Sequence, residues 1–124
     1  MTDPQRILLV GDLHMNSQVA LEVIDHAQAV KADLILQVGD FGYWPRAEDD
    51  AGVEYLTLVD DALAAAGLAL WFVPGNHEDW SELAKLPIGR DGRRAVGARI
   101  FEPPVGYRWA WGSTRWLPIR GARP

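Results

Sequence analysis

The chain of 124 residues has the length of one ordinary domain, and its composition, 48% hydrophobic and 23% charged, is typical of folded globular proteins. These values exclude a disordered chain and a collagen-like repeat. No apolar run approaches the roughly 18 residues needed to span a bilayer, and residues 7–10 are too short a run for a signal peptide. We therefore expect a cytoplasmic protein that does not enter a membrane.

The charge distribution and the absence of cysteine restrict which partners the chain could bind and which residues could ligate a metal. Residues 1–62 hold 3 Lys/Arg against 12 Asp/Glu, whereas residues 63–124 hold 9 against 5. The acidic half fits either solvated helix faces or carboxylates that gather to bind cations, and a net charge of -5 disfavours a protein that coats nucleic acid. Because the chain has no cysteine, a bound metal would need His, Asp, Asn or water as ligands.

Three short apolar runs, at residues 6–11, 33–39 and 68–74, predict buried strands, since each one stops at Gly or Pro. The two intervals between them carry apolar residues at helical spacing. Strands that are joined through helices are almost always parallel, with right-handed crossovers. The order β-α-β-α-β therefore predicts a layered α/β domain whose strand carboxyl ends share one edge.

The two expected helices have recognisable ends. Residues 17–32 form the first, with Ser17 as its N-cap, and residues 53–66 form the second, which Gly67 ends. A third, short helix is expected at residues 80–86, where Glu78 and Asp79 would act as acidic helix starters.

The segment after residue 80 has a different texture. Residues 87–97 predict a Gly- and Arg-rich loop. Three short strands are expected after it, at residues 100–101, 107–111 and 115–119, with a hairpin turn at residues 112–114 between the last two. The last strand runs into Gly121 and the chain then ends. We therefore expect one partial domain over residues 1–124, with a metal-binding core at 6–80 and the first strands of a second part at 81–124.

A glycine-led motif follows each of the three expected parallel strands: Gly11-Asp12-Leu13-His14, Gly39-Asp40 and Gly75-Asn76-His77-Glu78. Glycine at a strand end permits positive φ or close backbone approach, and ligands of α/β sheets bind at this edge. We expect the polar side chains of the three motifs to meet: Asp12, His14, Asp40, Asn76 and His77. Carboxylate, imidazole and amide groups without sulfur suit Mn, Fe, Zn or Co.

The ordered motifs D-x-H, G-D and G-N-H-[DE] resemble those of the calcineurin-like metallophosphoesterases, a family of binuclear-metal phosphatases, phosphodiesterases and nucleases. The resemblance implies a sandwich fold, of which this chain would supply the N-terminal half. It implies that Asp12 and His14 hold the first of two divalent ions, that Asp40 bridges both ions, and that Asn76 holds the second. It also implies that His77 is catalytic, contacting the phosphate and assisting the leaving group.

The chain departs from the family pattern downstream. Family members add a further metal-binding histidine and a G-H-x-H motif, but this chain has only His14, His26 and His77. His26 lies four residues after Glu22 on the polar face of the first expected helix, so it cannot substitute. The second metal site should therefore be incomplete.

Two functions follow. The first is a metal-dependent phosphoesterase that hydrolyses a phosphomonoester or phosphodiester with a metal-activated water. The alternative is a truncated, non-catalytic fragment that binds at most one metal tightly or needs a partner chain. A nucleotide-binding doubly wound module is disfavoured, since residues 11–16 lack the spaced glycines of a phosphate loop.

The aromatic residues allow more than one interpretation. Residues 41–44 would form either a wall of the metal cleft or a lid. The tryptophans of 109–116 could stack nucleic-acid bases beside two arginines, but their alternation in a strand favours core packing. Nucleic acid is thus a possible but unsupported partner, and an unpaired Trp-rich sheet edge would favour association with another chain.

Overall fold

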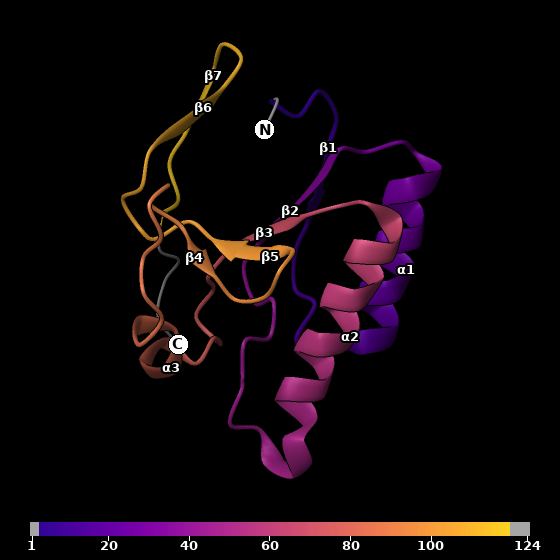
Figure 1. Cartoon of the computed structure of the whole chain (residues 1–124), viewed down its shortest axis with the longest axis vertical. Coiled ribbons are helices and arrows are strands. Elements are labelled where there is room, and N and C mark those ends of the chain that lie inside the picture. Colours follow the sequence, from indigo (N-terminus) through magenta and orange to yellow (C-terminus); the bar gives the residue numbers. More distant parts are fainter. Residues whose placement is uncertain (1–2, 120–124) are drawn as a thin grey trace.

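The computed structural model describes residues 3–119. Strands and helices alternate through the first half, as the sequence pattern predicts, and short strands dominate the second half (Figure 1). In chain order the elements are β1 (Ile7–Val10), α1 (Ser17–Ala29), β2 (Leu34–Val38), η1 (Glu48–Asp50), α2 (Ala51–Ala66), β3 (Leu70–Val73), α3 (Trp80–Ala84), β4 (Arg94–Ala95), β5 (Ile100–Glu102), β6 (Trp109–Trp111) and β7 (Thr114–Trp116).

A sheet with the strand order β1-β2-β3-β5-β4 forms the centre of the described residues. Strands β1, β2, β3 and β5 are parallel, and only β4 runs antiparallel to its neighbour β5. The expected parallel β-α-β-α-β unit is confirmed, and it brings the carboxyl ends of β1, β2 and β3 to one edge. The fold is α/β, whereas the expected absence of a C-terminal half stays a prediction.

Helices α1 and α2 cover one face of the sheet, lying side by side in Figure 1. Their apolar positions recur at helical spacing, and alternate residues of the strands meet them, as burial of one helix stripe and one sheet face requires. The buried side chains of this layer include Ala20, Ile24, Ala27, Ile35, Tyr55, Val59, Leu63, Leu70 and Phe72.

Tryptophans cover part of the opposite face. The hairpin of β6 and β7 packs Trp109, Trp111 and Trp116 against Trp71 of β3. This confirms core packing for the tryptophans. The expected unpaired Trp-rich edge stays a prediction, since β6 and β7 pair only with each other among the described residues. The indole N–H groups of Trp71, Trp109 and Trp116 are buried with no acceptor among residues 3–119, so apolar contact holds the cluster together.

The N-cap of α1 lies one residue earlier than predicted. The N-cap is Asn16, whose side chain accepts a hydrogen bond from the N–H of Val19 at 3.1 Å. The prediction of Ser17 is wrong because a shorter turn before the helix already places the Asn16 side chain at the free N–H groups. The helix ends at Ala29, short of residue 32, and Lys31 takes a positive φ of 58°. In α2 the predicted end at Gly67 is confirmed, with φ 69°.

The strands of the second half differ in their bounds from those predicted, and β5 is one residue longer than the expected 100–101. Residues 94–95 form β4 inside the expected loop, because they pair with β5. Strand β6 occupies only the last part of 107–111. Strand β7 begins at Thr114, which the sequence placed in the turn, and ends at Trp116, short of residue 119. A two-residue turn at Gly112 and Ser113 joins the two strands. Residues 120–124, which include Gly121, lie outside the described residues. Among those described, no helix is long and apolar enough to cross a membrane.

Candidate metal centre

The loops that follow β1 and β2 continue the pairing of their strands. The N–H of Asp12 donates to the carbonyl of Gly39 at 3.0 Å, and the N–H of His14 donates to the carbonyl of Asp40 at 2.8 Å. Backbone hydrogen bonds between the two segments therefore continue beyond the last strand residues. It places the Asp12–His14 turn directly beside Asp40.

The same loops adopt an unusual backbone conformation. Asp12, His14, Met15 and Asp40 all have positive φ, at 55°, 48°, 58° and 52°. Residues other than glycine rarely adopt this region, and each one costs on the order of 1–3 kcal/mol unless its surroundings hold it. Such strain clusters at functional sites, and here three of the four residues are expected metal ligands.

Only two of the three motif glycines have the expected positive φ or close approach of another chain segment. Gly39 has a φ of 113°. Gly75 allows close approach, because a Cβ there would lie 2.3 Å from Oδ1 of Asp40. Gly11 needs neither, since a Cβ would meet only Val38 at 3.9 Å. The expectation is therefore wrong for Gly11, whose space is open.

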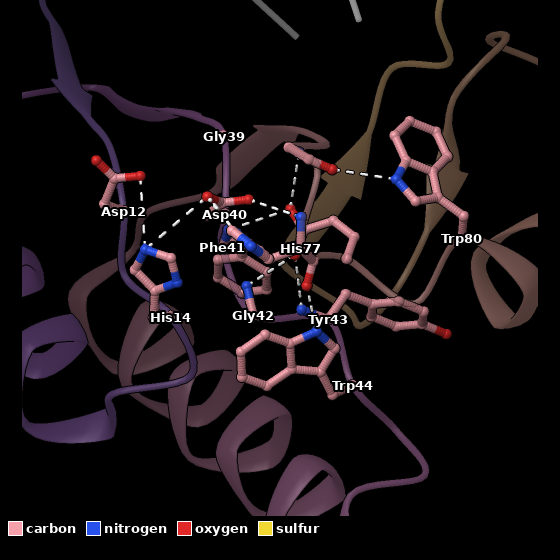
Figure 2. A network of polar contacts seen from close by, with 12 residues as sticks. Asp12, His14, Gly39, Asp40, Phe41, Gly42, Tyr43, Trp44, His77 and Trp80 are labelled. Atoms are coloured by element: carbon pink, nitrogen blue, oxygen red, sulfur yellow. Dashed lines mark hydrogen bonds and ion pairs between the residues drawn. The ribbon is translucent and has the colours of Figure 1, made fainter. Parts of the chain in front are cut away.

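Three polar side chains converge at the strand ends, as Figure 2 shows. One potential ligand atom from each of His14, Asp40 and His77 lies within 4.8 Å of the others. His14 Nε2 lies 3.9 Å from Asp40 Oδ2 and 3.6 Å from Asp12 Oδ1. The sequence predicts that these residues and Asn76 meet. The structure brings His14, Asp40 and His77 together and places Asp12 beside His14.

His77 contacts both carboxylate oxygens of Asp40. Its backbone N–H donates to Oδ1 at 3.0 Å, and its ring Nδ1 lies 3.1 Å from Oδ2. Since an ionised carboxylate only accepts hydrogen bonds, Nδ1 carries the ring proton in this contact. Asp40 is buried, with 12% of its side chain exposed, whereas His77 is 52% exposed.

The pKa of Asp40 is held below its ordinary value. Burial acts to raise the pKa of this carboxyl, but the two hydrogen bonds from His77 and the positive charges that His77 and His14 can carry outweigh burial. Asp40 is therefore a carboxylate at neutral pH. An anionic, buried oxygen pair beside two imidazoles is suited to hold a cation.

Asn76 borders the same site. A cavity of about 500 Å³ opens at the strand ends, and Asp12, Asp40 and Asn76 line it. The three strand-end motifs thus contribute to one space. No hydrogen bond or ion pair connects the Asn76 side chain to the other expected ligands in the described part of the chain, so its role as a second-ion ligand stays a prediction.

Glu78 has a different position from the one the sequence predicts. The sequence predicts a helix starter at Glu78, but Glu78 is 7% exposed and its carboxylate accepts four backbone N–H groups that lie outside α3. Oε1 accepts from Gly42 at 2.9 Å and Tyr43 at 3.0 Å, whereas Oε2 accepts from Phe41 and Gly75, both at 3.1 Å. The carboxylate therefore joins the Asp40 loop to the loop that carries His77.

The expectation for Asp79 as a helix starter is confirmed. Its side chain accepts the N–H of Glu82 at 3.2 Å and caps α3. The same carboxylate binds Arg46 at 2.9 Å, and this hydrogen bond holds the pKa of Asp79 below its ordinary value. Asp79 thus adds a third link between the loop after β2 and the chain after β3.

The aromatic residues after Asp40 are mostly core residues, so the expected cleft wall is wrong for two of them. Phe41 and Tyr43 are 0% and 5% exposed, and both rings stack on Phe72 of β3. Trp44 differs, because its indole N–H donates to the carbonyl of His77 (Figure 2). The core contacts of Phe41 and Tyr43 and the loop contact of Trp44 therefore hold the chain that follows Asp40 in place.

Comparison with known protein families agrees with this geometry. The family model described as calcineurin-like phosphoesterase matches residues 5–121. The chain therefore belongs to the calcineurin-like phosphoesterase family, whose members are generally hydrolases of phosphate esters. The match extends past the three motifs through the tryptophan hairpin. Comparison with curated proteins gave no match.

The residues present suit a divalent cation. Imidazole nitrogens and carboxylate oxygens without thiolate match borderline or hard ions, and the 4.8 Å spread of the ligand atoms is small enough for one ion to contact all three groups after slight adjustment. Besides His14 and Asp40, this group includes His77, to which the family resemblance assigns a catalytic role.

Proposed function

We propose that this chain is a metal-dependent phosphoesterase that hydrolyses a phosphomonoester or phosphodiester with a metal-activated water. The observation that carries the proposal is the convergence of His14, Asp40 and His77 at the strand ends of a chain that belongs to a phosphoesterase family. The substrate is therefore a phosphate ester. The domain division at residue 80 and the cytoplasmic location stay predictions.

The proposed ligand roles follow the three motifs. Asp12, His14 and Asp40 would hold the first ion, and Asp40 together with Asn76 would hold the second. Divalent ions of this kind polarise phosphoryl oxygens and lower the pKa of water, which supplies a nucleophile at neutral pH. The exposed fractions support access from solvent, since the Asp12 and His14 side chains are 77% and 46% exposed.

His77 is the proposed catalytic residue. Its Nδ1 holds a proton against Asp40, which orients the ring and leaves Nε2 as the nitrogen that a substrate can reach. A ring that is protonated at Nε2 can donate this proton to the departing oxygen of the ester. Because His77 is half exposed, the ring can meet a ligand without first leaving the core.

A second candidate is a non-catalytic chain that binds one metal tightly or requires a partner chain. The observation that favours it is the unequal ligand supply, with three expected ligands for the first ion but only Asp40 and Asn76 for the second.

Metal content and hydrolysis of bis(p-nitrophenyl) phosphate, measured on the purified chain with added Mn²⁺, separate the two candidates. The phosphoesterase predicts two ions per chain and turnover that Asp40→Asn and His14→Ala abolish. The matched controls are Asp25→Asn and His26→Ala, which change the same residue types at exposed positions of α1. One ion without turnover would support the second candidate, and full activity in Asp40→Asn would overturn the first.

A further inference from the structure

The cavity beside the candidate metal centre has two chemically different ends. Asp12, Asp40 and Asn76 line one end. The rest of its wall is apolar and comes from β2, β3, the β6–β7 hairpin and the segment after β7. A volume of about 500 Å³ lies in the range of small-molecule sites, which typically combine an apolar wall with a few polar groups.

Two indoles form part of the apolar wall. Trp109 and Trp116 both line the cavity and are nearly parallel, with an interplanar angle of 10° and ring centroids 6.1 Å apart. Both pack against the tryptophan cluster, since Trp111 lies 5.4 Å from Trp109 and 5.3 Å from Trp116. The indoles are therefore held in place before any ligand arrives, which reduces the entropy lost on binding.

Exposed aliphatic side chains complete this wall. Val38 is 54% exposed and Leu117 is 48% exposed, although both are apolar and both line the cavity. Val38 is separated from Asp40 by a single residue, so the apolar wall begins directly beside the expected metal ligands. A ligand that bridged the two ends would remove this apolar surface from water.

We propose that this cavity binds the planar aromatic group of a phosphate ester, with the phosphate at the end lined by Asp12, Asp40 and Asn76. The inference rests on the proposed phosphoesterase function and names its substrate class. Indole walls favour an aromatic ring over a flexible alkyl chain, because aromatic rings gain edge-to-face or offset-stacked contacts with each other. The charged groups that line the cavity, Asp12 and Asp40, are acidic, so the phosphate requires a bound cation.

Binding of non-hydrolysable phosphonates tests the proposal without relying on turnover. The chain, loaded with Mn²⁺, is titrated with 1-naphthylphosphonate and with methylphosphonate, and the dissociation constants are measured by calorimetry. We expect the naphthyl compound to bind at least about tenfold more tightly, from the apolar area that the ring buries. Equal affinities for the two compounds would overturn the proposal.

Surface variants locate the binding. Leu117→Ser and Val38→Ser should each weaken naphthylphosphonate binding about three- to tenfold while methylphosphonate binding stays unchanged. Ile88→Ser is the matched control, because Ile88 is 56% exposed and does not line the cavity. All three positions are exposed, so the variants should fold, which circular dichroism checks. A loss of naphthyl affinity in the Ile88→Ser variant alone would contradict the assignment.

The outcomes of the two proposals are distinguishable. Metal-dependent hydrolysis without preference for the naphthyl compound would leave the phosphoesterase intact and remove the aromatic site. Tighter binding of the naphthyl compound without hydrolysis would support the aromatic site and remove the phosphoesterase. A nucleoside 5′-phosphonate as third ligand identifies the source of the ring: tighter binding than the naphthyl compound assigns a nucleobase, and weaker binding assigns a simple aryl group.

Discussion

The carboxylate of Asp40 occupies the space in which a side chain on Gly75 would begin. A Cβ at position 75 would lie 2.3 Å from Oδ1 of Asp40 and 2.4 Å from its backbone nitrogen. The position of Asp40 in the loop after β2 therefore requires glycine at position 75, in the loop after β3. The two motifs depend on each other although they belong to the ends of different strands, β2 and β3.

The first prediction concerns this contact. Gly75→Ala should displace the Asp40 carboxylate, lowering Mn²⁺ affinity about 10- to 100-fold and stability by about 1–3 kcal/mol, because the new methyl group overpacks a buried site. Gly11→Ala is the matched control, since a Cβ at Gly11 would meet only Val38, at 3.9 Å. Calorimetric metal titration of both variants checks the prediction. Equal Mn²⁺ affinity in the two variants would contradict it.

The second prediction concerns Glu78. Glutamine offers only one acceptor oxygen, so Glu78→Gln would turn its NH₂ group toward backbone donors and leave buried N–H groups unpaired. We expect a loss of about 3 kcal/mol in the free energy of unfolding, measured in urea. Metal affinity should fall about tenfold as well, because the two ligand loops lose their link.

Glu22→Gln provides the control for Glu78→Gln. It makes the same change at an exposed position of α1, where a shift within about 0.5 kcal/mol is expected. If both variants unfolded at the same urea concentration, Glu78 would have no part in joining the loops.

The third prediction concerns the ion pair of Arg94 and Glu102 in the neighbouring strands β4 and β5. Arg94 Nη1 donates to Oε1 of Glu102 at 3.0 Å, and the Glu102 side chain is 2% exposed. Burial raises the pKa of Glu102 above 4.5, and Arg94 opposes this shift. Arg94→Ala should therefore destabilise the chain by about 3–5 kcal/mol at pH 7, because it leaves a buried carboxylate unpaired.

The pH dependence has a definite sign. Burial raises the pKa of Glu102 in the folded state. The free energy of unfolding therefore falls as the pH rises from the pKa of Glu102 in the unfolded state through its pKa in the folded state. The effect of Arg94→Ala should hence shrink at pH 4, where Glu102 is mostly protonated in both states. Urea unfolding at pH 7 and pH 4 measures this, with the exposed Arg90→Ala as control. An Arg94→Ala effect that is equal at the two pH values would exclude this origin.

The fourth prediction concerns metal binding and stability. Since a ligand that binds only the folded state stabilises it, Mn²⁺ at 100 times its dissociation constant should add about 2.7 kcal/mol to the free energy of unfolding. EDTA should remove this increment, and His14→Ala should abolish it. Thermal or urea unfolding with and without Mn²⁺ provides the measurement. An equal increment in the His14→Ala variant would place the ion elsewhere.

Local pattern alone was enough to predict the first half of the fold. Apolar runs that stop at Gly or Pro located β1, β2 and β3, and helical spacing located α1 and α2, because period and end signals act within a few residues of the chain. The rule that parallel strands share one edge then predicted that Asp12, His14, Asp40, Asn76 and His77 meet. The structure confirms this convergence for His14, Asp40 and His77, and it places Asp12 beside His14.

Tertiary structure decided what depends on distant partners. An acidic residue at position 78 is typical of a helix start, but the Glu78 carboxylate is buried, and three of the four N–H groups that it accepts lie 35 to 37 residues earlier in the chain. The placement of the tryptophan hairpin over the sheet face, and of Trp109 and Trp116 beside the strand ends, is likewise set by packing against Trp71. Sequence periodicity specifies which face of an element is apolar, whereas the partner that covers this face is chosen by three-dimensional packing.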